Sequence, residues 1–320
     1  MLKEISVEIT RRCPNYCLHC SSSAHSQCNE SMPYETFQTV ISDAAKLGTK
    51  TICLSGGEPF LHDKIVQMIQ FVHSKGMECY VYTSGIAMSS SDQRISLPME
   101  QLRQISGAVT KIIFNIEAST EAIYDRIMGT SNCFSLLKES VLRANAAGIC
   151  TEAHFVPMAL NLREIPAVVR LCEELNISKL SFLRLVLHGR AEQNYNTLAL
   201  TEQEQSELKE YLHKIKTQPG LAIRVGIPLS IDSGCSHCEA ASGKLNIRYD
   251  GKVFPCEVFK NHSFQKNIKG LQPDSIYQHS LIDIYNHSSY LIRVRELSDN
   301  FSDRCETCVG QYLIKMEEKA

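Results

Sequence analysis

The chain has 320 residues, 43% of them hydrophobic and 21% charged, and its formal net charge is −2. This length and composition are typical of a globular protein with one large domain and a smaller one. The nearly balanced charge argues against nucleic acid or an anionic membrane surface as a partner. No apolar run is long enough to span a membrane, and the first residues lack the apolar core of a signal peptide. We therefore expect a cytoplasmic protein.

Strand-like and helix-like patterns alternate along the first 190 residues. The predicted strands are 5–10, 51–56, 78–85, 111–119, 150–158 and 179–187, and the predicted helices between them are 31–48, 64–76, 99–107, 134–148 and 165–176. Alternation with short connections predicts right-handed crossovers and a parallel sheet with helices outside. Six β/α units indicate an α/β fold, a partial (β/α)6 TIM-like barrel, rather than a closed barrel of eight units.

The pattern changes after the helical stretch 201–218. A strand is predicted at 221–228 and a hairpin at 245–256, where an Asp-Gly pair provides the turn between two alternating runs. This part is short and rich in cysteine. We therefore predict two domains, a barrel over residues 1–218 and a small α+β domain over residues 219–320.

Fourteen cysteines are many for such a chain. Because the cytosol keeps thiols reduced, ligation of a metal or cluster is a better explanation than disulfides. Six cysteines are assigned no such role, four as small core residues and two in polar surroundings: Cys53, Cys79, Cys150 and Cys172, then Cys28 and Cys133. The other eight fall into two groups, at residues 13–20 and 235–308.

The first group is the segment CPNYCLHC, in which Cys13, Cys17 and Cys20 have C-x3-C-x2-C spacing directly after the first strand. Three thiolates on one loop can bind three irons of a cubane cluster, which normally has four protein thiolates. One iron then keeps an open position at which another molecule can bind. A zinc site is the alternative, although closed zinc sites usually combine two C-x2-C pairs.

The second strand ends in SGGEP, residues 55–59. Two glycines allow close backbone approach, and Glu58 can accept a hydrogen bond from an ammonium group. This motif one strand after the cysteine segment resembles the radical S-adenosylmethionine (SAM) superfamily. The resemblance implies that a [4Fe–4S] cluster on the three cysteines binds SAM and cleaves it to a 5′-deoxyadenosyl radical. It also implies that four residues hold the methionyl amino group: Gly56, Gly57, Glu58 and Pro59.

Two later strands carry segments that are similar to the same family. YTSG, residues 82–85, resembles the segment near the methionyl carboxylate and implies a contact from Ser84. FNIEAS, residues 114–119 and followed by YDRIMG, implies that Asn115 reaches the ribose and that Glu117 faces the substrate. Many relatives have Asp at the latter position. Each of these residues can equally be part of the scaffold.

Two further features fit the family pattern. LRLVLHGRA, residues 183–191, resembles the sixth-strand segment that precedes a common Gly-Arg pair. His19 stands where many relatives have an aromatic residue, which implies packing near adenine; the alternative is an ordinary loop residue.

The second group of cysteines follows a different pattern. Cys238-x17-Cys256 and a later Cys305-x2-Cys308 resemble the twitch domain, the shorter relative of the SPASM domain. The resemblance implies that these four cysteines hold an auxiliary [4Fe–4S] cluster, which makes the second domain cluster-binding. Further cysteines for a second auxiliary cluster are absent after Cys256, so we predict a single one. A zinc site on two cysteine pairs is the alternative.

Cys235 has three interpretations. It can replace Cys238 as a ligand, donate a hydrogen atom to a substrate radical as a catalytic residue, or have no special role.

The resemblance implies a radical SAM enzyme whose substrate is most often a ribosomally synthesised peptide. Oxidation or rearrangement of a small metabolite is the alternative, and a non-catalytic iron–sulfur or zinc protein is a remote one. The first strand begins at about residue 5, which leaves no room for a leader-binding domain before it and slightly disfavours the peptide. The expected electron donor is a flavodoxin or ferredoxin.

Overall fold

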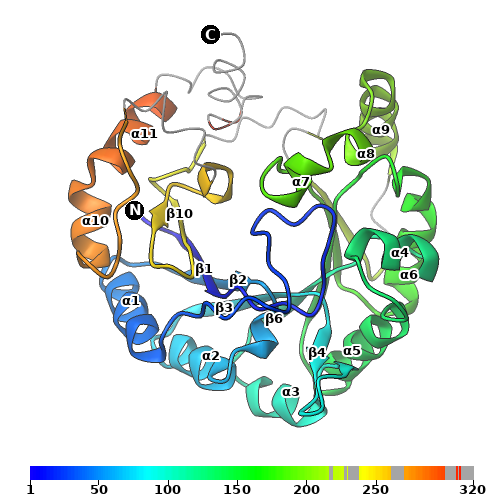
Figure 1. Cartoon of the computed structure of the whole chain (residues 1–320), viewed down its shortest axis with the longest axis horizontal. Coiled ribbons are helices and arrows are strands. Elements are labelled where there is room, and N and C mark those ends of the chain that lie inside the picture. Colours follow the sequence, from blue (N-terminus) through cyan, green and yellow to red (C-terminus); the bar gives the residue numbers. More distant parts are fainter. Residues whose placement is uncertain are drawn as a thin grey trace.

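The computed structural model describes residues 1–215, 219–226, 229, 238–260, 270–299, 308 and 310. Within these ranges the main sheet has the strand order β11-β10-β1-β2-β3-β6-β7-β8-β9. Every neighbouring pair in it is parallel except β10 and β11. Figure 1 shows the helices as an arc around the outside of the curved sheet, open on one side. This arrangement confirms the predicted partial barrel.

The elements follow the predicted order. The strands of the six repeats are β1 Glu4–Thr10, β2 Thr51–Gly56, β3 Glu78–Thr83, β6 Lys111–Asn115, β7 Thr151–Phe155 and β8 Lys179–Phe182. The main helices are α1 Tyr34–Lys46, α2 Ile65–Ser74, α3 Met99–Ile105, α4 Glu121–Met128, α5 Phe134–Ala146, α6 Ile165–Glu174 and α9 Glu202–Lys214. Several predicted strands extend too far at their carboxyl ends, because the chain leaves the sheet there while its polar and apolar residues still alternate.

Several smaller elements complete the described chain. They are β4 Ile86–Met88, β5 Arg94–Ser96, η1 Pro59–Leu61, η2 Leu162–Glu164, α7 Arg190–Gln193, α8 Tyr195–Leu198, β9 Ala222–Val225, β10 Lys244–Ile247, β11 Val253–Phe254, η3 Glu257–Lys260, α10 Leu281–His287 and α11 Ser289–Asp299. Sequence patterns did not predict α4 or the β4–β5 hairpin. No helix in the described residues is long and apolar enough to cross a membrane.

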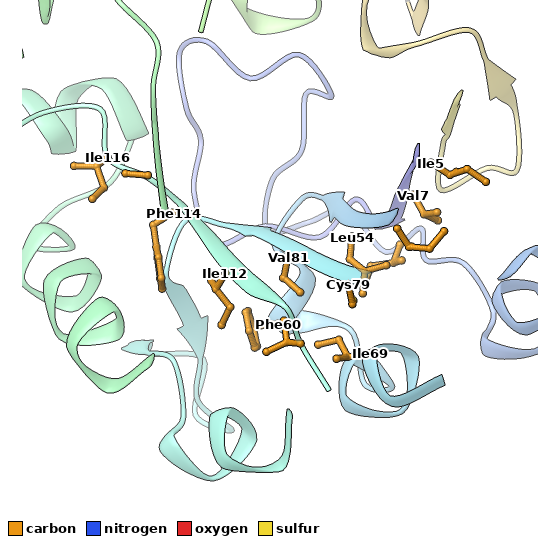
Figure 2. Close-up of a cluster of buried hydrophobic side chains, with 14 of the residues drawn as sticks. Ile5, Val7, Leu54, Phe60, Ile69, Cys79, Val81, Ile112, Phe114 and Ile116 are labelled. Atoms are coloured by element: carbon orange, nitrogen blue, oxygen red, sulfur yellow. The ribbon is translucent and has the colours of Figure 1, made fainter. Parts of the chain in front are cut away.

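The hydrophobic core lies between the outer face of the sheet and the helices. Figure 2 shows Val7, Leu54, Val81 and Ile112 on this face, with Phe60 beneath them. Each apolar side chain buried in this way contributes about 1.5–3 kcal/mol to stability. Because side chains alternate along a strand, the intervening polar residues face the inside of the barrel, where they border the candidate site.

Residues beyond 218 also contribute strands to the main sheet. β9 pairs with β8, and Lys179 is in register with Ala222. β10 pairs with β1 at the other end of the repeats, and Glu4 is in register with Lys244. The boundary between 218 and 219 stays a prediction, and the sheet continues across it. The predicted hairpin forms from β10 and β11.

Three cysteines differ in burial from the interpretation of the sequence. Cys150 is exposed, although its apolar neighbours indicated a core position. Cys28 and Cys133 are buried, although their neighbours in sequence are polar. Burial at these positions depends on which elements pack over the loop, and sequence neighbours do not determine that.

Candidate active site at the carboxyl ends of the strands

The cysteine loop, residues 11–25, follows β1 and is the dark blue loop beside α7 in Figure 1. Cys13 is buried, and Cys17 and Cys20 are partly buried. Burial raises the pKa of the Cys13 thiol, and the neighbouring Cys17 raises it further. Burial and the proximity of Cys20 likewise raise the pKa of Cys17. The loop therefore brings the three sulfur atoms close enough to interact electrostatically.

The last turn of α4 holds the middle of this loop. The backbone N–H of Tyr16 donates to the carbonyl oxygen of Met128 at 3.1 Å, and that of Leu18 donates to Ile127 at 2.8 Å. These carbonyls have no partner inside their own helix. Gly129 then ends the helix at φ 60°, and a Cβ there would lie 2.2 Å from the Tyr16 carbonyl oxygen. A glycine is therefore required where the helix meets the loop.

Arg190, the first residue of α7, holds the other side of the loop. Its side chain donates to the carbonyl oxygens of Cys17 and Ala24, each at 2.8 Å. Its backbone N–H donates to the Cys20 carbonyl oxygen at 3.0 Å. The guanidinium also lies 4.0 Å from the ring centroid of Tyr16, a cation–π contact. The Gly-Arg pair noted in the sequence thus fixes the cysteine loop.

The two glycines at the end of β2 pack against the end of β1 and the start of the loop. The N–H of Gly57 donates to the Thr10 carbonyl oxygen at 2.7 Å. A Cβ on Gly56 would lie 2.2 Å from that same oxygen, and one on Gly57 would lie 2.2 Å from the carbonyl oxygen of Arg12. The close approach for which these glycines are needed is therefore to the backbone where β1 passes into the cysteine loop. Pro59 follows as the first residue of η1.

Glu58 is fully buried between β2 and β3. One carboxylate oxygen accepts from Thr83 Oγ1 at 2.6 Å and Phe60 N at 3.3 Å; the other accepts from Ser84 N at 2.9 Å and Ser84 Oγ at 2.6 Å. Burial raises the pKa of Glu58 although these hydrogen bonds oppose the rise. A carboxylate accepts about four hydrogen bonds, so an ammonium group would have to share or displace one of these donors.

His19 and Glu117 lie together across the site. His19 Nε2 is 3.4 Å from one carboxylate oxygen of Glu117, and the other oxygen accepts from Val156 N at 2.9 Å. The side chains are 12% and 1% exposed. The sequence assigned these residues to adenine and to the substrate separately and did not predict their contact. Asn115 ends β6, in register with His154 on β7.

The loop also buries polar atoms for which the described residues supply no partner. Asn15, between the first two cysteines, is 2% exposed, and neither atom of its amide has a hydrogen-bond partner there. Nδ1 of His19 is in the same situation. Leaving such a group unpaired costs about 1–3 kcal/mol, so a bound group at this loop fits these residues. The sequence analysis did not single out Asn15, although a polar residue between two candidate ligand cysteines could have indicated it.

The loop carries the set of ligands that a cubane cluster needs, three thiols on one segment. Among the described residues, no three side chains from His, Cys, Asp and Glu converge closely enough to hold one metal ion. A cubane distributes its thiolate ligands over separate irons, so three neighbouring but separate thiols are the expected arrangement.

The second cysteine group forms another site. Burial raises the pKa of the Cys256 thiol to about 12, and the neighbouring Cys308 and Cys238 also raise it. Three of the four predicted ligands therefore lie together. Cys305 and Cys235 fall outside the described residues, so their proposed roles stay predictions.

Family models match both sites. The model of the radical SAM superfamily matches residues 7–172, which include the first cysteine group and the glycine motif. A model of an iron–sulfur cluster-binding domain, SPASM, matches residues 238–309.

Known sequences and structures resemble most of the chain. PqqA peptide cyclase of Xanthomonas axonopodis pv. citri is 24% identical over 296 residues, which are 91% of this chain and 76% of the cyclase. Fe-coproporphyrin III synthase of Methanosarcina barkeri is 24% identical over 268 residues, 82% of this chain and 63% of the synthase.

Among solved structures, Streptococcus suis SuiB bound to S-adenosylmethionine superposes with a TM-score of 0.72 at 14% identity, over 93% of this chain and 68% of SuiB. Native anSMEcpe with bound AdoMet superposes with a TM-score of 0.64 at 12% identity, over 90% of this chain and 81% of that protein. At such identities the likeness shows a common fold.

Proposed function

The chain belongs to the radical SAM superfamily, and on that premise we propose that this enzyme modifies a ribosomally made peptide. Its cofactors are S-adenosylmethionine and iron–sulfur clusters. When bound, SAM and its cluster supply a 5′-deoxyadenosyl radical that abstracts a hydrogen atom from the substrate. The observation that carries the peptide proposal is the likeness to PqqA peptide cyclases over 91% of the chain. The likeness to SuiB bound to its precursor peptide SuiA supports it at the level of the fold.

The residues of the chain divide the work between holding the clusters and enclosing the substrate. Cys13, Cys17 and Cys20 would bind the cluster that carries SAM, while Arg190 and the end of α4 keep their loop in place. Because Glu58 already accepts four hydrogen bonds, we assign it to fixing the ends of β2 and β3. Acceptance of the methionyl amino group then falls mainly to neighbouring backbone.

The polar inner face of the barrel would enclose the substrate. Tyr82 and His154 face each other there, with ring centroids 5.2 Å apart. Glu117 follows β6, the strand between theirs, and lies beside His19. Asn115, at the end of β6, would contact the ribose of SAM. The auxiliary cluster would be held by Cys238, Cys256 and Cys308, with Cys305 as the fourth ligand.

A small metabolite is the second candidate substrate. The similarity to Fe-coproporphyrin III synthase, whose name denotes a tetrapyrrole product, supports it over 82% of the chain. Under either proposal we assign electron delivery to a flavodoxin or ferredoxin in the cytoplasm, where thiols remain reduced.

The test uses anaerobically reconstituted protein with SAM, a reductant and a synthetic precursor peptide encoded beside the gene. We expect 5′-deoxyadenosine, and a peptide two mass units lighter if the reaction is a crosslink or a dehydrogenation. An unchanged mass with deuterium taken up from solvent indicates epimerisation and supports Cys235 as a hydrogen donor. The Cys13/Cys17/Cys20→Ala variant is the control and should form neither product.

Two outcomes would count against the proposal. Formation of 5′-deoxyadenosine with no change in any neighbouring peptide would favour a metabolite. No 5′-deoxyadenosine at all, from protein with intact clusters and a competent reductant, would contradict SAM cleavage.

A further inference from the structure

The segment that follows β8, residues 183–190, contacts both cysteine sites. At its end, Arg190 binds the cysteine loop. Two residues earlier, the buried His188 donates from Nε2 to the carbonyl oxygen of Val258 at 2.7 Å, and Val258 is two residues after Cys256. The segment is therefore fixed at both sites.

The third contact of this segment is with a sulfur atom. Arg184 Nη2 lies 3.2 Å from Cys308 Sγ, which is within hydrogen-bond distance for a sulfur acceptor. The other terminal nitrogen, Nη1, is buried and has no hydrogen-bond partner in the described ranges. Among the described residues no carboxylate forms an ion pair with this guanidinium, and the contact at 3.2 Å directs its charge at the thiol.

We propose that Arg184 donates a charge-assisted hydrogen bond to the Cys308 thiolate of the auxiliary cluster and raises the reduction potential of that cluster. This inference rests on the proposed assignment of Cys308 as a cluster ligand. Arg184 is then a positioning and tuning residue, because it acts through the cysteine and not on the substrate. Nothing in the spacing of the cysteines indicates it, since 124 residues separate the two partners.

The direction of the effect follows from charge. Reduction adds negative charge to a cluster and its thiolates, and a nearby cation with an N–H donor stabilises that charge. Partial burial strengthens the interaction because the local dielectric is low. Hydrogen bonds to sulfur and solvent exposure are among the factors that set cluster potentials. A raised potential makes the auxiliary cluster a better electron acceptor.

The experiment compares full-length proteins in two backgrounds. The wild-type background has both clusters, and the potential of the SAM-binding cluster serves there as an internal control. The Cys13/Cys17/Cys20→Ala background leaves the auxiliary cluster alone. In each we would compare Arg184 with Arg184→Met, which removes charge and donors, and with Arg184→Lys, which keeps the charge. Arg170→Met, on the exposed side of α6, is the matched control for loss of a surface charge.

The readouts are iron and zinc per chain, the electron paramagnetic resonance spectrum of the reduced cluster, and its midpoint potential by redox titration. We expect Arg184→Met to keep about four irons in the triple-alanine background. Reduction of the auxiliary cluster should become about tenfold less favourable, which lowers its midpoint potential by about 59 mV for one electron. Arg184→Lys should lower the midpoint potential by a smaller amount, and Arg170→Met should leave the midpoint potential unchanged.

Three results would overturn the inference, in distinguishable ways. An unchanged potential in Arg184→Met with about four irons overturns the role of Arg184 and leaves the cluster assignment standing. Zinc in place of iron in the triple-alanine protein with Arg184 intact overturns the cluster assignment and this inference with it. If Arg184→Met does not retain the cluster, the test rests on Arg184→Lys. A midpoint potential of Arg184→Lys equal to that of wild type then overturns the inference.

Discussion

At the scale of single residues, the position of the cysteine loop depends on glycines whose surroundings leave no room for a side chain. Gly189 has φ 56°, and a Cβ there would lie 2.6 Å from Ser23 Oγ and 2.8 Å from the carbonyl oxygens of Cys20 and Ser21. Real Cβ atoms do not approach backbone oxygen this closely. The glycine before Arg190 is therefore as necessary for the loop as the arginine itself.

Gly189→Ala should push away the part of the loop that carries Cys20. We expect a loss of about four irons per chain and of SAM cleavage, while the auxiliary cluster is kept. Gly148→Ala is the matched control, because Gly148 also has positive φ (76°) but has nothing within 4 Å of an added Cβ. Iron analysis and 5′-deoxyadenosine assays give the answer, and full iron with normal cleavage in Gly189→Ala would contradict it.

His154 makes a second prediction at this scale. Burial, followed by the positive charge of Arg224, lowers the pKa of His154 to about 3, although Glu152 opposes the shift. An unfolded histidine titrates near about 6.5. Below that pH the unfolded chain binds a proton that the folded chain does not bind, so stability falls as the pH falls towards 3.

The slope from this group approaches about 1.4 kcal/mol per pH unit below its unfolded pKa. His154→Phe keeps a ring against Tyr82 and should remove this part of the pH dependence. Urea denaturation of the anaerobic protein between about pH 7 and 5.5 measures it against wild type. His73→Gln, on the exposed side of α2, is the control and should keep the wild-type slope. Equal slopes for wild type and His154→Phe would contradict the prediction.

At the scale of elements, the ends of strands and helices matter more than their middles. The candidate site is built from residues that follow β1, β2, β3, β6 and β8, and from the last carbonyls of α4. The β10–β11 hairpin places the second site in the same way. Its turn contains the Arg248–Asp250 ion pair and Gly251 at φ 79°, and Cys256 comes two residues after β11.

Gly251→Ala should disturb this hairpin. The added Cβ would lie 2.5 Å from Tyr277 Cε2, and positive φ disfavours alanine by about 1 kcal/mol or more. We expect partial loss of auxiliary-cluster iron with SAM cleavage intact, the reverse of Gly189→Ala. Gly270→Ala, with φ 73° and an open environment, is the control. Loss of SAM cleavage without loss of auxiliary iron would contradict this assignment.

At the scale of the molecule, a buried ion pair joins the first strand to the C-terminal region. Lys260 Nζ contacts the carboxylate of Glu8 on β1, and Ser22 of the cysteine loop donates to the same carboxylate at 2.8 Å. Burial opposes the charge of Lys260, but Glu257 and Glu8 outweigh burial and raise its pKa. The pair thus links β1, the cysteine loop and η3, the short helix that follows Cys256 of the second site.

Lys260→Met should leave the Glu8 carboxylate buried without its counter-charge. Removing one partner of a buried pair costs about 3–5 kcal/mol. Because Glu8→Gln removes the stranded charge, the double variant should lose less stability than the sum of the two single variants. Urea denaturation of the four proteins measures the coupling. Additive losses would show that the pair does not join the two regions.

The sequence by itself determined the features that local patterns encode. The alternation of strand and helix patterns predicted the partial barrel, because the spacing at which apolar residues recur shows which face of each element is buried. The two cysteine groups and the SGGEP motif indicated the family and predicted where along the chain its sites lie. The Asp-Gly pair located the hairpin, because few residues adopt the backbone angles of its turn.

Only the tertiary structure decided which distant residues meet. His19 and Glu117, Glu8 and Lys260, and Arg184 and Cys308 are each separated by at least 98 residues. The additional strands β9 and β10 join opposite ends of the six-repeat sheet for the same reason. The period of a local pattern records only whether a face is buried or exposed, whereas these pairings depend on the strand register of the curved, open sheet and on where each loop leaves it.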